Sequence, residues 1–205
     1  MSRRAIGLVA LALVMSTAHG AKAMPSCPFL TDPAGDPGVM GVPIQDDASD
    51  ITVVNVSTRH KTLTASISVV GRPVNNDPGI SRRYEVYLAT GEATYVLRAT
   101  LGNGASLFEL VSNAQVADSG LGASLQSWQG QKSIQGGVSA HVVAISASLD
   151  RELPLFGRRV DVFARTWLAA ANDVPAAGRT SPDGIAASVD ATDTRRYRVG
   201  DPGCT

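Results

Sequence analysis

The chain has 205 residues, and its 18 basic and 18 acidic side chains give a formal net charge of zero at pH 7. This balance excludes the strong positive field on which binding to nucleic acid or to anionic lipid depends. If residues 1–23 are removed as a leader, 15 basic residues remain against 18 acidic ones. The remaining residues 24–205 are sufficient for one domain with a substantial hydrophobic core.

The first 23 residues predict a cleaved signal peptide. Arg3 and Arg4 precede an unbroken apolar segment, Ala5 to Met15, and Ala21-Lys22-Ala23 is typical of a cleavage site. As a helix, the apolar segment spans only about 16 Å, too short to cross a bilayer. We expect cleavage near Ala23, no retained membrane span and a secreted or periplasmic protein. Ser2-Arg3-Arg4 is also weakly similar to a twin-arginine signal, so both the Sec and twin-arginine routes stay open.

Both cysteines, Cys27 and Cys204, lie in the mature chain and close to its two ends. In an oxidising compartment, two lone cysteines usually pair. We therefore predict a Cys27–Cys204 disulfide, which would stabilise the fold by about 5 kcal/mol in the chain-entropy view and bring the two termini to the same end of the domain.

The sequence predicts an all-β fold. Alternation of apolar residues with Thr or Ser, clearest from Thr62 to Val69, is typical of half-buried antiparallel strands. Arg59-His60-Lys61 fits a hairpin connection, and residues 71–82 are expected to form a loop. Only residues 150–157 and 114–125 could hold a helical turn. The expected strands are residues 50–58, 62–69, 84–90, 93–100, 106–111, 139–149, 159–168, 185–189 and 195–199. This spacing indicates two packed antiparallel sheets in one domain, a jelly-roll-like β-sandwich.

Three segments resemble a known group of proteins: the opening Cys27-Pro28-Phe29-Leu30-Thr31-Asp32-Pro33-Ala34-Gly35-Asp36, then Asp47-Ala48-Ser49-Asp50-Ile51, and the closing Tyr197-Arg198-Val199-Gly200-Asp201-Pro202-Gly203-Cys204. They are similar to secreted bacterial β-sandwich domains related to DOMON-like folds and family-nine carbohydrate-binding modules. The resemblance implies a sandwich that sometimes binds calcium and occurs alone or attached to secreted enzymes, but no particular ligand. Near its end the chain departs from that pattern, with only Asp190 and Asp193 where a denser acidic stretch is common.

The acidic loops are candidate calcium ligands. Calcium takes six to eight oxygen ligands, and an Asp-x-x-x-Asp segment held by Pro and Gly could supply two carboxylates and a carbonyl. The candidates are Asp32, Asp36, Asp50, Asp190 and Asp193, with Asp46 and Asp47 nearby in the sequence. The alternative is that these aspartates only form turns, because an Asp side chain caps its own backbone.

A candidate ligand-binding face follows from strand alternation. If Tyr84, Val86 and Leu88 face the core, their neighbours point outward, and the same holds for the strand at residues 159–168. The candidate residues are Glu85, Tyr87, Arg98, Asp161, Phe163, Arg165 and Trp167. Rings with flanking charges are typical of carbohydrate-binding surfaces, since sugar faces stack on rings and hydroxyls bond to charged groups. The alternative places Phe163 and Trp167 in the core.

No catalytic motif is evident. His60 and His141 have no partner at metal-ligand spacing, and no Gly-x-Ser-x-Gly motif occurs. The sequence favours a non-catalytic exported module that binds a carbohydrate or an envelope polymer. A structural or protein-interaction module of the cell envelope is the second hypothesis. A secreted hydrolase that uses a carboxylate pair such as Glu85 and Asp161 is the third.

Overall fold

The computed structural model describes residues 27–39, 42–73, 80–102, 104–113, 129–170 and 187–203. Within these ranges the protein is all-β and contains no helix, as the sequence predicts. The predicted leader, Cys204 and residues 114–125 lie outside the described residues. No described helix is long and apolar enough to cross a membrane.

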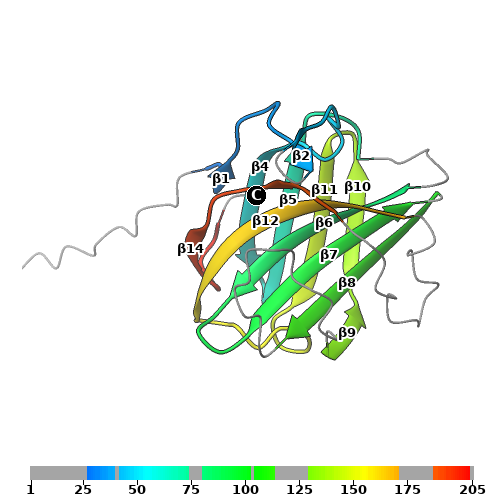
Figure 1. The fold of residues 1–205 in the computed structure, drawn as a ribbon. Helices are drawn as coiled ribbons and strands as arrows, with labels where there is room; N and C mark the ends of the chain where they lie inside the picture. The colour runs from blue at the N-terminus through cyan, green and yellow to red at the C-terminus, as the bar shows by residue number, and fades with distance from the viewer. Residues whose placement is uncertain are drawn as a thin grey trace, which may run out of the picture.

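Two antiparallel sheets form a sandwich, and their strands cross at an angle (Figure 1). The five-stranded sheet has the order β1 (Leu30–Thr31), β4 (Ile51–Arg59), β5 (Thr62–Val69), β11 (Val142–Ser148) and β10 (Gln135–Ser139). The seven-stranded sheet has the order β13 (Ala187–Ala191), β12 (Arg159–Ala170), β6 (Ile80–Ala89), β7 (Thr94–Gly102), β8 (Ala105–Asn113) and β9 (Gln129–Ser133), with β14 (Arg195–Arg198) also paired to β12. A small hairpin joins β2 (Gly38–Val39) to β3 (Val42–Pro43).

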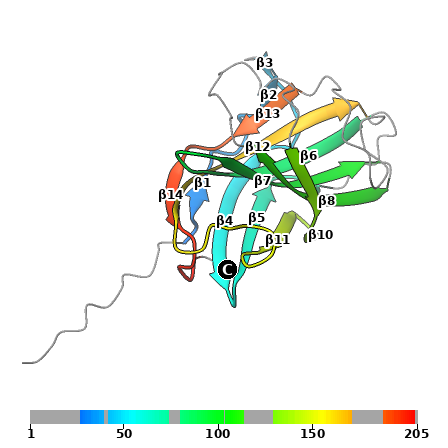
Figure 2. The ribbon, with the colours of Figure 1, turned by 90° about the horizontal axis from the view of Figure 1, so that it is seen from below.

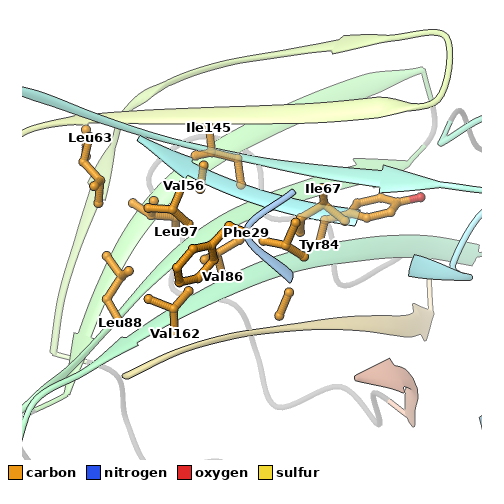
Figure 3. Close-up of a cluster of buried hydrophobic side chains, with 14 of the residues drawn as sticks. Phe29, Val56, Leu63, Ile67, Tyr84, Val86, Leu88, Leu97, Ile145 and Val162 are labelled. Atoms are coloured by element: carbon orange, nitrogen blue, oxygen red, sulfur yellow. The ribbon is translucent and has the colours of Figure 1, made fainter. Parts of the chain in front are cut away.

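The core lies between the two sheets and is built by the predicted alternation. Tyr84, Val86 and Leu88 on β6 face the buried residues Leu63 and Ile67 on β5 (Figure 3). Removing one such side chain from water is worth roughly 1.5–3 kcal/mol, so this shared apolar layer holds the sheets together.

The predicted hairpin after β4 is confirmed. Arg59 pairs with Thr62, leaving His60 and Lys61 as a two-residue turn with φ angles of 48° and 64°. Positive φ at both positions is what a type I′ turn needs to match the twist of its strands. Residues 150–157, where a helical turn was expected, form turns and no helix, and the first turn is closed by a helix-type hydrogen bond from the Glu152 N–H to the Ser148 carbonyl (2.9 Å).

One side of the sandwich is closed by a chain segment shared between the sheets. β9 belongs to the seven-stranded sheet and β10 to the five-stranded one, with only Ile134 between them. The Ile134 N–H donates to the carbonyl of Phe108 on β8 (3.1 Å). A Cβ on Gly136 would collide with the Phe108 ring, so glycine allows this close approach.

The two ends of the described chain meet along β4. The Phe29 N–H donates to Asn55 Oδ1 (3.2 Å), and the ring of Phe29 packs edge-on against Tyr197 with centroids 5.7 Å apart. Gly203 approaches the Val56 carbonyl so closely that no Cβ would fit. No described cysteine is free. Because Cys204 lies outside the described residues, the Cys27–Cys204 disulfide stays a prediction.

Candidate functional site

The five aspartates predicted as metal ligands come from segments that meet at one end of the sandwich. Asp32 follows β1, Asp36 precedes β2, and Asp50 precedes β4. Asp190 lies in β13 and Asp193 just after it. The backbone sets this arrangement, because the Asp32 N–H donates to the Thr52 carbonyl (3.0 Å) and β2 packs beside β13 (Figure 2). We call these five residues the acidic cluster.

Carboxylate oxygens of Asp32, Asp36 and Asp190 all lie within 4.8 Å of one another. Backbone donors hold the carboxylates of Asp190 and Asp50 in place. The Ile51 N–H donates to Asp190 Oδ2 (2.6 Å), and the Gly35 N–H donates to Asp50 Oδ2 (2.6 Å). Gly35 has a φ of 90°, a conformation that favours glycine, and this turn presents its N–H to Asp50.

The acidic cluster is electrostatically strained. Burial raises the pKa of Asp32 to about 7, and the charges of Asp190, Asp36, Asp193 and Asp50 add to this effect. Burial also raises the pKa of Asp190 and of Asp50, although backbone hydrogen bonds partly oppose this in both. Two buried oxygens, Asp32 Oδ2 and Asp50 Oδ1, have no hydrogen-bond partner. Such a set of oxygens could accommodate a cation.

The Asp46 carboxylate has partners outside the acidic cluster. Asp46 forms an ion pair with Arg82 on β6 (2.8 Å) and accepts a hydrogen bond from the Ser49 hydroxyl (2.5 Å). The Asp46 backbone carbonyl also accepts the N–H groups of Ser49 (2.8 Å) and Asp50 (3.1 Å). Asp46 therefore forms a turn, which is the role that the alternative interpretation gave to all of these aspartates.

The outer face of the seven-stranded sheet carries a line of opposite charges. Arg165 on β12 is directly across from Glu85 on β6, Glu85 from Arg98 on β7, and Arg98 from Glu109 on β8. We call these four residues the charged row. Oppositely charged residues across from one another stabilise strand pairing, so the row favours this register over its alternatives.

At the centre of the charged row is a buried ion pair. The Arg98 Nε donates to Glu85 Oε1 (2.5 Å), and the Tyr87 hydroxyl donates to Glu85 Oε2. Only 3% of Glu85 and 8% of Arg98 is exposed. Burial alone would raise the pKa of Glu85, but the Arg98 charge and these two hydrogen bonds outweigh it and lower the pKa below the usual value. Glu85 is therefore held as a carboxylate.

Next to the charged row lies an apolar row, in which Phe163, Tyr87, Val96 and Val111 are cross-strand neighbours. The rings of Tyr87 and Phe163 stack, with centroids 4.5 Å apart and an interplanar angle of 7°. The Arg165 guanidinium carbon lies 5.2 Å from the Phe163 centroid and 5.8 Å from that of Tyr87, within cation–π range. The four residues of the apolar row form a cluster separate from the main core.

The predicted orientation of the candidate face is therefore right, and its predicted exposure is largely wrong. Tyr87 is only 3% exposed and Trp167 only 8%, whereas Phe163 and Arg165 are half-buried. The Trp167 Nε1 is buried without a hydrogen-bond partner. The alternative placed Phe163 and Trp167 in the core. It is right about the burial of Trp167, but Phe163 stays half-buried, with its ring stacked on Tyr87 on the outer side of the sheet.

Glu109, Val96 and Val111 complete the two rows and were not among the predicted site residues. Their positions could have been inferred from the alternation within residues 93–100 and 106–111, but choosing their partners requires the strand register. Asp161, also on the outer face, pairs with Arg196 (3.1 Å), and its side chain is 48% exposed.

The carboxylate pair suggested for a hydrolase does not come together. Arg165, the cross-strand neighbour of Glu85, is four residues from Asp161 on β12. At about 3.3 Å per residue this places the two acids about 13 Å apart along the sheet, beyond the roughly 5–9.5 Å of glycosidase pairs. His60 is exposed in its turn, and a ring nitrogen of His141 lies 2.9 Å from the Gly71 carbonyl.

Comparison with known proteins finds no significant match to a family model, to a curated protein or to a solved structure.

Proposed function

We propose that this chain is an exported, non-catalytic module that binds a carbohydrate or an envelope polymer on the outer face of its seven-stranded sheet. The observation that supports this proposal is the stacked Tyr87–Phe163 pair with Arg165 beside both rings. An amphipathic ligand such as a sugar can place an apolar face on a ring and direct its hydroxyls to neighbouring charged groups.

In this proposal the residues have different roles. Phe163, Arg165 and Asp161 keep part of their surface accessible, so they would contact the ligand. Glu85 and Tyr87 are buried and would act as positioning residues, because the Tyr87 hydroxyl bonds to Glu85 and the Tyr87 ring supports Phe163. A platform whose parts are fixed before binding loses less conformational freedom when the ligand arrives.

The test is retention of the protein on a panel of immobilised polysaccharides and envelope polymers, with and without calcium. We expect at least one polymer to retain the wild type, and Phe163→Ala or Arg165→Met to weaken retention about tenfold, the loss expected from one good stacking or polar contact. Phe156→Ala is the matched control, since Phe156 is an exposed aromatic residue (63%) in the turns between β11 and β12.

Failure of every polymer to retain the protein would refute this proposal and favour the second hypothesis, a structural or protein-interaction module. Equal retention of wild type and Phe163→Ala would show that any polymer binds elsewhere.

A further inference from the structure

We propose that the acidic cluster binds one calcium ion through Asp32, Asp36, Asp190 and Asp50, and that the ion fastens the N-terminal segment to β13. This site is independent of the proposed polymer-binding surface around Phe163 and Arg165, which we call the ligand face. The two lie on opposite faces of the seven-stranded sheet, because Asp190 on β13 is directly across from the buried Thr166 of β12, whereas Phe163 and Arg165 are on the outer face of the same strand.

The first support is geometric. Oxygens of Asp32, Asp36 and Asp190 lie within 4.8 Å of one another. Calcium binds its oxygen ligands at about 2.3–2.6 Å, so two ligands on opposite sides of the ion are up to about 5 Å apart. The three carboxylates can therefore share one calcium ion with only small side-chain adjustments.

The second support is Asp50, which does not belong to that triad. Asp50 is only 2% exposed, and its Oδ1 has no hydrogen-bond partner although its Oδ2 accepts the Gly35 N–H. Two hydrogen bonds place Asp50 beside the triad, because its Oδ2 accepts the N–H of Gly35, the neighbour of Asp36, and the N–H of Ile51, the residue after Asp50, donates to Asp190. A buried carboxylate oxygen without a partner is costly, and a cation would satisfy it. The buried Asp32 Oδ2 also lacks a hydrogen-bond partner, and the same cation would satisfy it.

The third support is the chemistry of the donors. The triad consists of carboxylates and contains no His or Cys, which argues against zinc or copper and for a hard cation that prefers oxygen. Two of the ligands come from an irregular loop, residues 32–36. Such loops suit the flexible coordination of calcium better than the strict octahedron of magnesium, whose ligands lie at about 2.0–2.1 Å.

The location of the ion gives it a structural role. Asp32 and Asp36 belong to the segment that follows β1, whereas Asp190 belongs to β13 of the other sheet. Asp190 also accepts the N–H of Ile51, the first residue of β4. An ion bound here would connect both sheets at the end of the sandwich where β2 lies beside β13 (Figure 2).

The test uses protein obtained from expression of the full chain, stripped of metal with a chelator and then titrated with calcium chloride, without any polymer. Isothermal titration calorimetry measures affinity, and thermal unfolding measures stability. We expect binding with a Kd of about 1 mM or below, and a rise in Tm of about 5–10 °C when calcium exceeds the Kd a hundredfold. Magnesium at equal concentration should give a clearly smaller shift.

The variants Asp36→Asn and Asp32→Asn should each weaken calcium binding at least about tenfold. Asp36 is exposed, so Asp36→Asn should fold normally, and both variants should unfold in chelator at the same temperature as the wild type or higher because they reduce repulsion. Asp150→Asn removes an equally charged but distant side chain and should leave the calcium response intact.

Absence of binding heat and of any Tm shift at millimolar calcium would overturn the proposal, as would wild-type affinity in both variants. An equal response to magnesium would refute the assignment to calcium. Because no polymer is present, none of these results depends on the ligand face.

Discussion

The buried Glu85–Arg98 pair permits a quantitative prediction about stability. Glu85→Gln keeps the size and shape of the side chain but removes its charge, so Arg98 is left buried without its closest counter-charge. Removing one partner of a buried ion pair usually costs about 3–5 kcal/mol. Glu109 is also directly across from Arg98 and stays in place, so we expect the lower end of that range, about 3 kcal/mol.

Urea unfolding followed by circular dichroism measures this loss. With a slope of about 2 kcal/mol per molar urea, a loss of 3 kcal/mol lowers the midpoint by about 1.5 M. Two comparisons identify the cause. The double variant Glu85→Gln/Arg98→Met removes both charges and keeps an acceptor for the Tyr87 hydroxyl, so it should be more stable than Glu85→Gln alone. Asp150→Asn breaks the exposed Lys61–Asp150 pair and should cost at most about 1 kcal/mol.

The reasoning is refuted if Glu85→Gln costs less than about 1 kcal/mol, because Arg98 would then not depend on this carboxylate. A double variant less stable than the single one would also contradict it, since the loss would then reflect packing rather than an unpaired charge.

Two further predictions follow from the same structure. The pKa of Glu85 is lower in the folded protein than in the unfolded chain, so the stability that the carboxylate provides is present above pH 4.5 and is lost as the pH falls below this value. Unfolding curves from pH 3 to 7 should therefore show that the difference in stability between wild type and Glu85→Gln shrinks in acid. A constant difference would contradict this prediction. Gly136→Ala should lower the free energy of unfolding by about 1–3 kcal/mol, because the added Cβ meets the Phe108 ring. Gly137→Ala is the control and should be close to neutral in the same urea assay, since its Cβ meets nothing within 4 Å. Equal losses of stability in both variants would be inconsistent with the close approach of β10 to β8.

Strands with clear alternation could be predicted from sequence, and strands that depend on pairing could not. Thr62–Val69 alternates along its whole length and was predicted with its observed bounds. β10 was missed because Gln135-Gly136-Gly137 has no apolar pattern, and its position is set by pairing with β11 and by the approach of Gly136 to Phe108. The loop expected at residues 71–82 overlaps β6, which starts at Ile80 and continues the ladder with β12.

The candidate sites show a similar division. Spacing and residue type identified the aspartates of the acidic cluster, but the sequence pattern did not show what brings Asp190 near Asp32. Pairing within the seven-stranded sheet positions β13, and the Ile51–Asp190 hydrogen bond fixes the Asp190 carboxylate. On the ligand face, alternation predicted that Glu85 and Tyr87 point away from the core. It could not predict their burial, because this depends on neighbours on adjacent strands that only the register defines.

The hydrogen bond between Ile51 and Asp190 also bears on the order in which the protein can fold. Its two residues are 139 positions apart, so the acceptor is synthesised long after the donor. At about 5–20 residues per second, the interval is roughly 7–28 s. Throughout that time the segment before β4 lacks its partner on β13, and one end of the sandwich stays open. Folding of this end of the domain can therefore finish only after Asp190 has been synthesised.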